Sequence, residues 1–425
     1  MNLGKKGEIH SSREFFWEAG RWLLGMKRSL STNSHHVFFC QETNTNFPSF
    51  APYNPGIVSA FWSLNTYVNQ RHLALPLALF LLLICWLINL EEYHKKPKKY
   101  SLIGWGGFGG ILLYLHSSIF VMTVVVLGIL FLLLPRQRLN IFIIGILGLL
   151  VSLPRVIFLK ESTIFIPHIK FGYLIADKLT LPHFLQYWLM NLGLLVILLP
   201  LGFFLSSKTA KKILIAFIFL FIIGNVVQFS PEIAANHKFF NVFVIVGNIF
   251  VAYAVLKIWK LKLPYKLIVP FLIFFSIFSG IIDFFPIKND QILTMEDYPK
   301  NHDIAWIMAN TPPKSVFLNS SYLYHPASIA GRRIFYGWPY FAWSLGYETE
   351  KHKEIMTEVF QANNLYQACS LLKNAKIDYI DTTSPSGIDI KINYGFFSNN
   401  FVPVYKSLKN DFTIYDVSKS CPHQK

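Results

Sequence analysis

Apolar residues fill long runs of this chain, and basic residues separate the runs. A helix needs about 20 mostly apolar residues to cross a hydrocarbon core of about 30 Å, and several runs have that length. Two shorter runs, 102–115 and 119–134, flank His116 and predict a pair of short helices. We therefore predict about eight crossings, or about six if the short pair is one re-entrant hairpin. The long runs are 73–90, 139–159, 187–205, 213–229, 239–256 and 267–285.

The formal charge of +16 is concentrated in alternate loops, which argues against nucleic acid as a partner. Short loops rich in lysine and arginine stay cytoplasmic, so the intervening loops and the chain after residue 285 are predicted outside. Contact with anionic lipid headgroups is sufficient to explain the positive charge of these loops. The predicted location is the cell membrane, with the bilayer as a partner. The basic loops hold Lys95, Lys96, Lys98 and Lys99; Arg136 and Arg138; Lys208, Lys211 and Lys212; and Lys257, Lys260, Lys262 and Lys266.

Hydrophobic residues make up 53% of the chain, but they are unevenly distributed and predict three parts. Residues 73–285 form a transmembrane helical domain, and residues 286–425 form an extracytoplasmic α/β domain in which helical and strand patterns alternate. Residues 1–72 form an outward N-terminal segment without the apolar core of a signal peptide. The simplest interpretation is a remnant of a longer chain. The alternative is an amphipathic helix on the membrane surface.

Cations and histidines recur where the apolar runs begin or end on the predicted outer side. Phosphate oxygens accept charge-assisted hydrogen bonds, so a cavity with several such groups would suit the phosphate of a membrane lipid. The alternative is that these side chains reach toward the interface, as flanking basic residues commonly do. The candidates for phosphate binding are Arg71, Arg155, His237 and Lys238, and His116 is a candidate cavity residue.

An aromatic and basic stretch in the C-terminal part predicts a second surface, which faces either an acceptor or the helical domain. Its candidate residues are Arg332, Arg333 and Trp338. The acidic loop residues Glu161, Asp177 and Glu232 form no paired arrangement, so no catalytic carboxylate is identified. No cofactor and no metal site are predicted. The sequence leaves open whether a divalent metal ion binds. Cys369 and Cys421 share the C-terminal part, so a disulfide between them is one option.

Four stretches together resemble the GT-C superfamily of polytopic glycosyltransferases, in particular its uncharacterised bacterial members. They are NTYVNQRHLAL, LLYLHSS, EIAANHKFFN and NTPPKSVFLNSSYLYHPASIAGRRIFYGWPYFAWSLGYET. The resemblance implies transfer of a sugar from a polyprenyl-phosphate carrier to an acceptor outside the membrane. It also implies carrier-phosphate contacts at Arg71, His237 and Lys238, with Arg155 behind them. Sugar and acceptor stay unknown.

The chain departs from this superfamily at one point. Members keep a catalytic Asp or Glu in the first outer loop, and residues 1–72 show no such acidic pair. The expectation is therefore a glycosyltransferase-like protein. The sequence leaves open whether this chain alone has catalytic activity. Two other classes stay open. A transporter or flippase predicts inverted repeats and polar residues at the bilayer midplane. A non-catalytic scaffold would bind a partner through its outer domain. It predicts an outer cavity in which cations do not converge.

Overall fold

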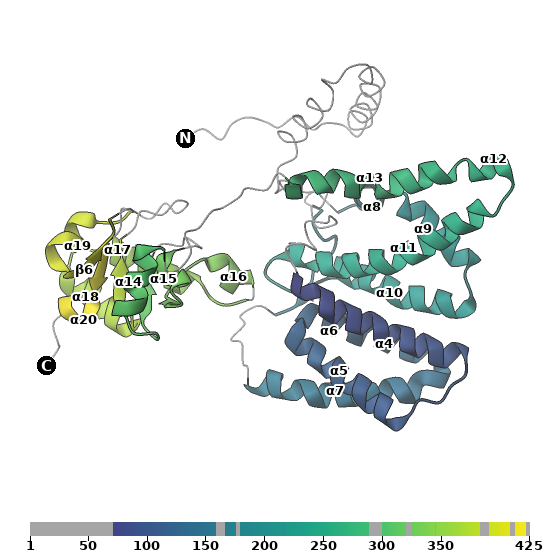
Figure 1. Cartoon of the computed structure of the whole chain (residues 1–425), viewed down its shortest axis with the longest axis horizontal. Helices are drawn as coiled ribbons and strands as arrows, with labels where there is room; N and C mark the ends of the chain where they lie inside the picture. The colour runs from purple at the N-terminus through teal and green to yellow at the C-terminus, as the bar shows by residue number, and fades with distance from the viewer. Residues whose placement is uncertain are drawn as a thin grey trace, which may run out of the picture.

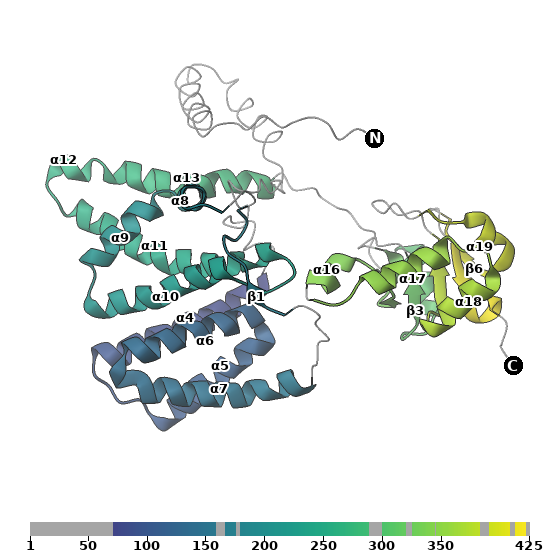
Figure 2. The same cartoon turned by 180° about the vertical axis from the view of Figure 1, so that it is seen from behind.

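The structure is a computed structural model that describes residues 71–158, 166–175, 179–288, 300–319, 325–344, 346–382, 391–408 and 413–421. Nearly all of the N-terminal segment predicted from the sequence lies outside these residues, as do Glu161 and Asp177. The described chain forms a helical domain and a smaller C-terminal domain with a sheet, which Figures 1 and 2 show beside each other.

The helical domain begins at Arg71 and ends at Lys288. Its short β1 and β2 pair antiparallel, with His168 opposite Gln228. The elements are η2 (Arg71–Leu73), α4 (Ala74–Glu92), α5 (Lys99–Leu115), α6 (Ser117–Leu133), η3 (Pro135–Gln137), α7 (Arg138–Phe158), β1 (His168–Ile169), α8 (Leu181–Leu192), α9 (Leu195–Leu205), α10 (Lys208–Val226), β2 (Val227–Gln228), η4 (Ile233–Asn236), α11 (His237–Trp259), α12 (Leu263–Lys266) and α13 (Val269–Lys288).

Among the described residues, four helical segments are long and apolar enough to cross a bilayer. They are Ala74–Glu92, Pro135–Ile157, Lys208–Val226 and Ile233–Trp259. The helices α8 and α9 meet at 81° and make a fifth candidate if they form one broken span. These segments agree with the predicted membrane protein, and the count of about eight crossings stays a prediction. The predicted pair of short helices around His116 is confirmed, because α5 ends and α6 begins beside it.

Small residues on α5 explain its close packing against α7. A Cβ atom on Gly110 would lie 2.5 Å from the carbonyl oxygen of Gly148 and 2.5 Å from the Cβ of Val151. A Cβ atom on Gly106 would likewise collide with the side chain of Leu147. Small residues let helix backbones approach closely where lipid-like surroundings provide no hydrophobic drive between helices. The glycine-rich segment of α5 therefore fixes the position of α7.

The C-terminal domain is a five-stranded mixed sheet with the order β4-β3-β5-β7-β6. In it, β3 pairs parallel with β4 and β5, whereas β7 pairs antiparallel with β5 and β6. The elements are α14 (His302–Asn310), β3 (Val316–Leu318), α15 (Pro326–Ile329), β4 (Arg333–Ile334), α16 (Pro339–Ser344), α17 (Glu350–Phe360), α18 (Leu365–Asn374), β5 (Tyr379–Asp381), α19 (Tyr394–Asn400), β6 (Pro403–Lys406), β7 (Thr413–Asp416) and α20 (Val417–Ser420).

The core of this domain lies between the sheet and its helices. Buried residues from β3, β5, α17, α18 and α19 form one apolar cluster that includes Phe360 and Phe397. Cys369 of α18 and Cys421 form a disulfide across this cluster, with their Cα atoms 5.5 Å apart. The disulfide that the sequence left open is therefore present. It links Cys421 covalently to α18.

Candidate functional site

The start of α11 is held by hydrogen bonds to the end of α10. The side-chain Nδ2 of Asn236 donates to the carbonyl oxygens of Gly224, at 2.9 Å, and Val227, at 2.6 Å. Nδ1 of the buried His237 lies 2.8 Å from the carbonyl oxygen of Ala234. A carbonyl oxygen only accepts, so Nδ1 carries the proton. These bonds set the direction in which α11 begins and fix the side chain of His237.

His116 occupies the turn between α5 and α6. Its backbone is extended, and its ring stacks on the ring of His72 with centroids 5.2 Å apart and planes 14° apart. The side chain is buried, and among the residues that the structure describes its Nδ1 has no hydrogen-bond partner. Burial, followed by the charges of Lys238 and His72, lowers the pKa of His116 to about 4. The imidazole is therefore neutral at pH 7, and its Nδ1 retains hydrogen-bonding capacity that none of the described residues satisfies.

Lys238 is the cation around which these groups gather. It acts electrostatically on His116 and on His237, and the carboxylate of Glu232 acts on Lys238 in turn. We call His72, His116, Glu232, His237 and Lys238 the helix-mouth cluster. Its members come from η2, from the turn between α5 and α6, and from the end of the α10–α11 connection together with the first residues of α11. The fold thus brings together residues from three separate parts of the sequence.

The C-terminal domain reaches the helix-mouth cluster through α16. The hydroxyl of Tyr340 donates a hydrogen bond of 2.5 Å to Oε2 of Glu232. Figures 1 and 2 agree that α16 is the part of the C-terminal domain that lies toward the helical domain. Glu232 therefore faces Lys238 on one side and the C-terminal domain on the other.

Of the residues predicted to bind the carrier phosphate, His237 and Lys238 lie in the cluster, and His116 joins them. Arg71 lies in η2, directly before His72, and its side chain is outside the described part of the structure. Arg155 lies in the last turn of α7, where its backbone N–H donates to the hydroxyl of Tyr114 at 3.1 Å. The role of Arg155 in phosphate binding stays a prediction.

The basic residues predicted for the second surface have different surroundings. The guanidinium of Arg332 donates to Oγ1 of Thr311 at 2.8 Å and to carbonyl oxygens around the end of α14, including those of Met308 and Thr311. These bonds satisfy carbonyls that the helix end leaves open. Arg333 is exposed on β4, and Trp338 is 45% exposed directly before α16. Arg332 thus has a structural role, whereas Trp338 is accessible.

Sequence reasoning considered Glu232 as an acidic loop residue but assigned it no role, and it did not select His72 or Tyr340. The available signal for Glu232 was its position five residues before His237, and the signal for His72 was its place beside Arg71. Tyr340 lies in the aromatic and basic stretch that was predicted to face an acceptor or the helical domain. Its pairing with Glu232 could not be predicted, because the two residues are 108 positions apart in the chain.

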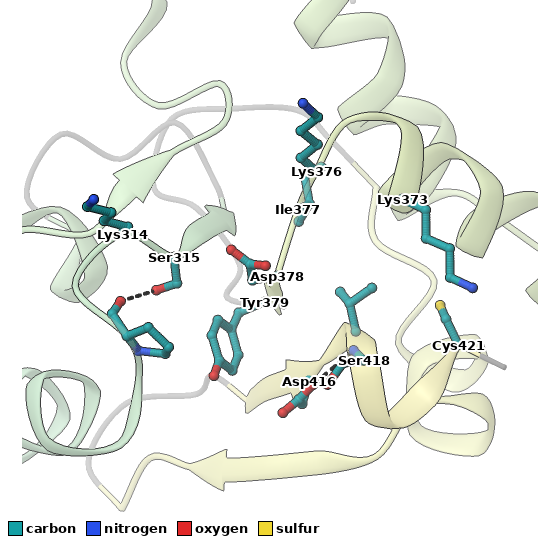
Figure 3. Close-up of a pocket in the computed structure, with 12 residues that line it drawn as sticks. Lys314, Ser315, Lys373, Lys376, Ile377, Asp378, Tyr379, Asp416, Ser418 and Cys421 are labelled. Atoms are coloured by element: carbon teal, nitrogen blue, oxygen red, sulfur yellow. Dashed lines mark hydrogen bonds between the residues drawn. The ribbon is translucent and has the colours of Figure 1, made fainter. Parts of the chain in front are cut away.

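A pocket of about 600 Å³ lies in the C-terminal domain, away from the helix-mouth cluster. Figure 3 shows Lys314, Lys373 and Lys376 around it. These lysines are exposed, and the acidic residues of the pocket already bind backbone: Asp378 accepts from the N–H of Val316 at 2.8 Å. Because nothing in this pocket is both buried and unsatisfied, the helix-mouth cluster is the stronger candidate site.

The helix-mouth cluster offers hydrogen-bond donors, one cation and one carboxylate beside an apolar span. Among the residues that the structure describes, no three His, Cys, Asp or Glu side chains are placed to hold a metal ion. The arrangement suits recognition of an anion by Lys238, and the neutral imidazole of His116 can donate one further hydrogen bond through Nδ1. Comparison of the chain with protein-family models and with curated proteins finds no match.

Proposed function

We propose that the helix-mouth cluster binds the phosphate group of a polyprenyl-phosphate carrier, as the resemblance to GT-C glycosyltransferases implies. The observation that carries this proposal is the position of Lys238: it is half-buried at the end of the apolar segment Ile233–Trp259, beside two buried histidines. A phosphate attached to a membrane lipid reaches the protein at this level. Ionisable groups at such positions are costly and face a cavity or a partner.

In this proposal, the protein is a membrane glycosyltransferase that transfers the carried sugar to an acceptor. Lys238 stabilises the phosphate that leaves when the bond between sugar and phosphate breaks. Glu232 is the carboxylate next to Lys238 and accepts the proton that the acceptor hydroxyl loses, in keeping with the acid–base role of carboxylates in sugar chemistry. The hydrogen bond from Tyr340 to Glu232 brings the C-terminal domain to the same site.

The proposal also includes about eight crossings of the cell membrane and an extracytoplasmic C-terminal domain. The disulfide between Cys369 and Cys421 supports that side, because disulfides persist in oxidising compartments. Reporter fusions at Lys98, at Lys211 and in the C-terminal domain test the orientation. Lys98 and Lys211 should report the cytoplasm, and a cytoplasmic C-terminal domain would contradict the proposal.

Binding is tested by titrating polyprenyl phosphate into the full chain in nanodiscs, with the matching polyprenol as the ligand that lacks the phosphate. We expect Lys238→Ala to weaken binding of the phosphate about tenfold or more. Hydrogen bonds to charged groups contribute about 1.5–3 kcal/mol, and about 1.4 kcal/mol corresponds to a factor of ten. The matched control is Lys257→Ala at the opposite end of α11. Equal weakening by both variants, or equal binding of polyprenol, would contradict the proposal.

A further inference from the structure

Four aromatic side chains of the C-terminal domain are exposed together at α16. The exposed fractions are 45% for Trp338, 43% for Tyr340, 55% for Phe341 and 42% for Trp343. The helix α16 has no buried residue. The ring of Tyr340 contacts two of the others, with its centroid 6.1 Å from that of Phe341 and 6.2 Å from that of Trp343. We call these four residues the aromatic knob.

The aromatic knob lies at the level where an apolar span ends. Tyr340 bonds to Glu232, and Glu232 directly precedes the candidate span Ile233–Trp259. Figures 1 and 2 show α16 extending from the C-terminal domain toward the helix ends of the helical domain. If the span fills the hydrocarbon core, then α16 lies in the headgroup layer beside it.

The spread of the rings indicates what covers them. At about 100° per residue, Tyr340, Phe341 and Trp343 occupy an arc of about 160° around α16. A sugar ring that stacks on an aromatic residue uses one face of one ring, so it would leave most of this arc in water. Phe341, which has no polar atom, has the largest exposed fraction of the four. A broad aromatic face with tryptophan and tyrosine is typical of a protein surface at the membrane interface, where amphipathic rings are stabilised.

We propose that the aromatic knob inserts into the phospholipid headgroup layer and anchors the C-terminal domain to the bilayer beside the helix-mouth cluster. The anchor is formed by α16 and by the preceding Trp338, and the bond from Tyr340 to Glu232 sets its position relative to the helical domain. This proposal depends on the helical domain spanning a bilayer. It does not depend on phosphate binding at Lys238, so the two can fail separately.

A fluorescent label at Phe341 tests the anchor in the full chain. Cys40 and Cys85 are replaced by serine, the Cys369–Cys421 disulfide is kept, and Phe341→Cys is labelled with NBD. The protein is reconstituted in phosphatidylcholine and phosphatidylglycerol nanodiscs with or without a lipid carrying a nitroxide just below its headgroup. Tyr366→Cys is the matched control, because Tyr366 is 71% exposed on α18 of the same domain.

We expect the lipid-borne nitroxide to remove most of the NBD emission at position 341 and little of it at 366. We also expect the emission at 341 to be shifted to shorter wavelength relative to 366. Equal quenching at both positions would overturn the proposal. So would a label at 341 that both the lipid nitroxide and aqueous iodide fail to quench, since that result would mean that protein covers the knob.

Discussion

The hydroxyl of Tyr340 lies 2.5 Å from Oε2 of Glu232, although the two residues are 108 positions apart in the sequence. The contact joins the C-terminal domain to the segment that leads into α11. Because Glu232 also acts on Lys238, the charge of the helix-mouth cluster and the placement of the C-terminal domain depend on the same carboxylate.

Tyr340→Phe should loosen the C-terminal domain without unfolding it. The substitution removes one hydrogen bond at an exposed position, so the change in the free energy of unfolding should stay at or below about 1 kcal/mol. We expect faster hydrogen–deuterium exchange over residues 338–344 in the full chain. Tyr394→Phe, a change at an exposed tyrosine of α19, is the control. Unchanged exchange in Tyr340→Phe would show that the contact does not hold α16.

The buried His116 should make the stability of the helix mouth depend on pH. Its pKa is about 4 in the folded protein and 6.5 without the fold. Between these values the unfolded chain binds more protons, so folding stability rises with pH in this window and falls on acidification. The loss from pH 7 to pH 4 should approach about 3 kcal/mol, at about 1.36 kcal/mol per pKa unit.

Thermal unfolding of the reconstituted protein between pH 7 and pH 4 measures this dependence. In His116→Gln the midpoint should vary less with pH than in the parent, because the titrating group is gone. His183→Gln is the control, since His183 is an exposed histidine on α8. If the pH dependence of the parent and His116→Gln coincide, then His116 is not the group that titrates.

Reduction of the Cys369–Cys421 disulfide should destabilise the C-terminal domain. The bond closes a segment of 52 positions, and such a disulfide typically contributes about 2–4 kcal/mol to the free energy of unfolding. Cys369→Ser with Cys421→Ser should therefore lower the unfolding midpoint of this domain and remove its response to dithiothreitol. Cys85→Ser serves as the control, because Cys85 is a free thiol. A midpoint that dithiothreitol does not change in the parent would contradict this expectation.

A buried pair between the residue that caps α15 and the last residue of β5 should contribute more to the stability of the same domain. Nε2 of His325 lies 2.9 Å from Oδ2 of Asp381, and both side chains are almost fully buried. Nδ1 of His325 accepts from the N–H of Ala327 at 3.1 Å, so Nε2 carries the proton toward the carboxylate. Removing one partner of a buried pair commonly costs about 3–5 kcal/mol.

Asp381→Ala should accordingly unfold the C-terminal domain at a markedly lower temperature than the parent. Glu348→Ala is a useful comparison, because it breaks the exposed ion pair of Glu348 with Lys351, at 3.3 Å. Exposed pairs contribute about 1 kcal/mol or less. Similar unfolding temperatures for the two variants would show that His325 and Asp381 do not stabilise the sheet.

The sequence predicted those parts of the fold that local patterns determine. The turn at His116 followed from two adjoining apolar runs, and the beginning of α11 followed from the polar residues before Phe239. The fragment interpretation and the positions of residues 1–70 lie outside what the structure describes.

The parts of the candidate site that depend on distant contacts could not be predicted. The stacking of His72 on His116 needs η2 to lie against the turn between α5 and α6. The hydrogen bond between Tyr340 and Glu232 forms only when the C-terminal domain is positioned against the helical domain. The surroundings of Arg332 were equally unpredictable: its position beside aromatic residues suggested a binding surface, and the structure shows its guanidinium bonded to groups at the end of α14.

Photo-crosslinking tests the central claim, phosphate binding at the helix mouth, most directly. A polyprenyl phosphate with a diazirine in the isoprene unit next to the phosphate is irradiated with the full chain in nanodiscs, and adducts are mapped by mass spectrometry. We predict adducts on peptides that contain His72, His116 or residues 232–241, which excess polyprenyl phosphate abolishes and Lys238→Ala reduces. Adducts mainly near Lys98, Lys211 or Lys260, unchanged in Lys238→Ala, would contradict the account.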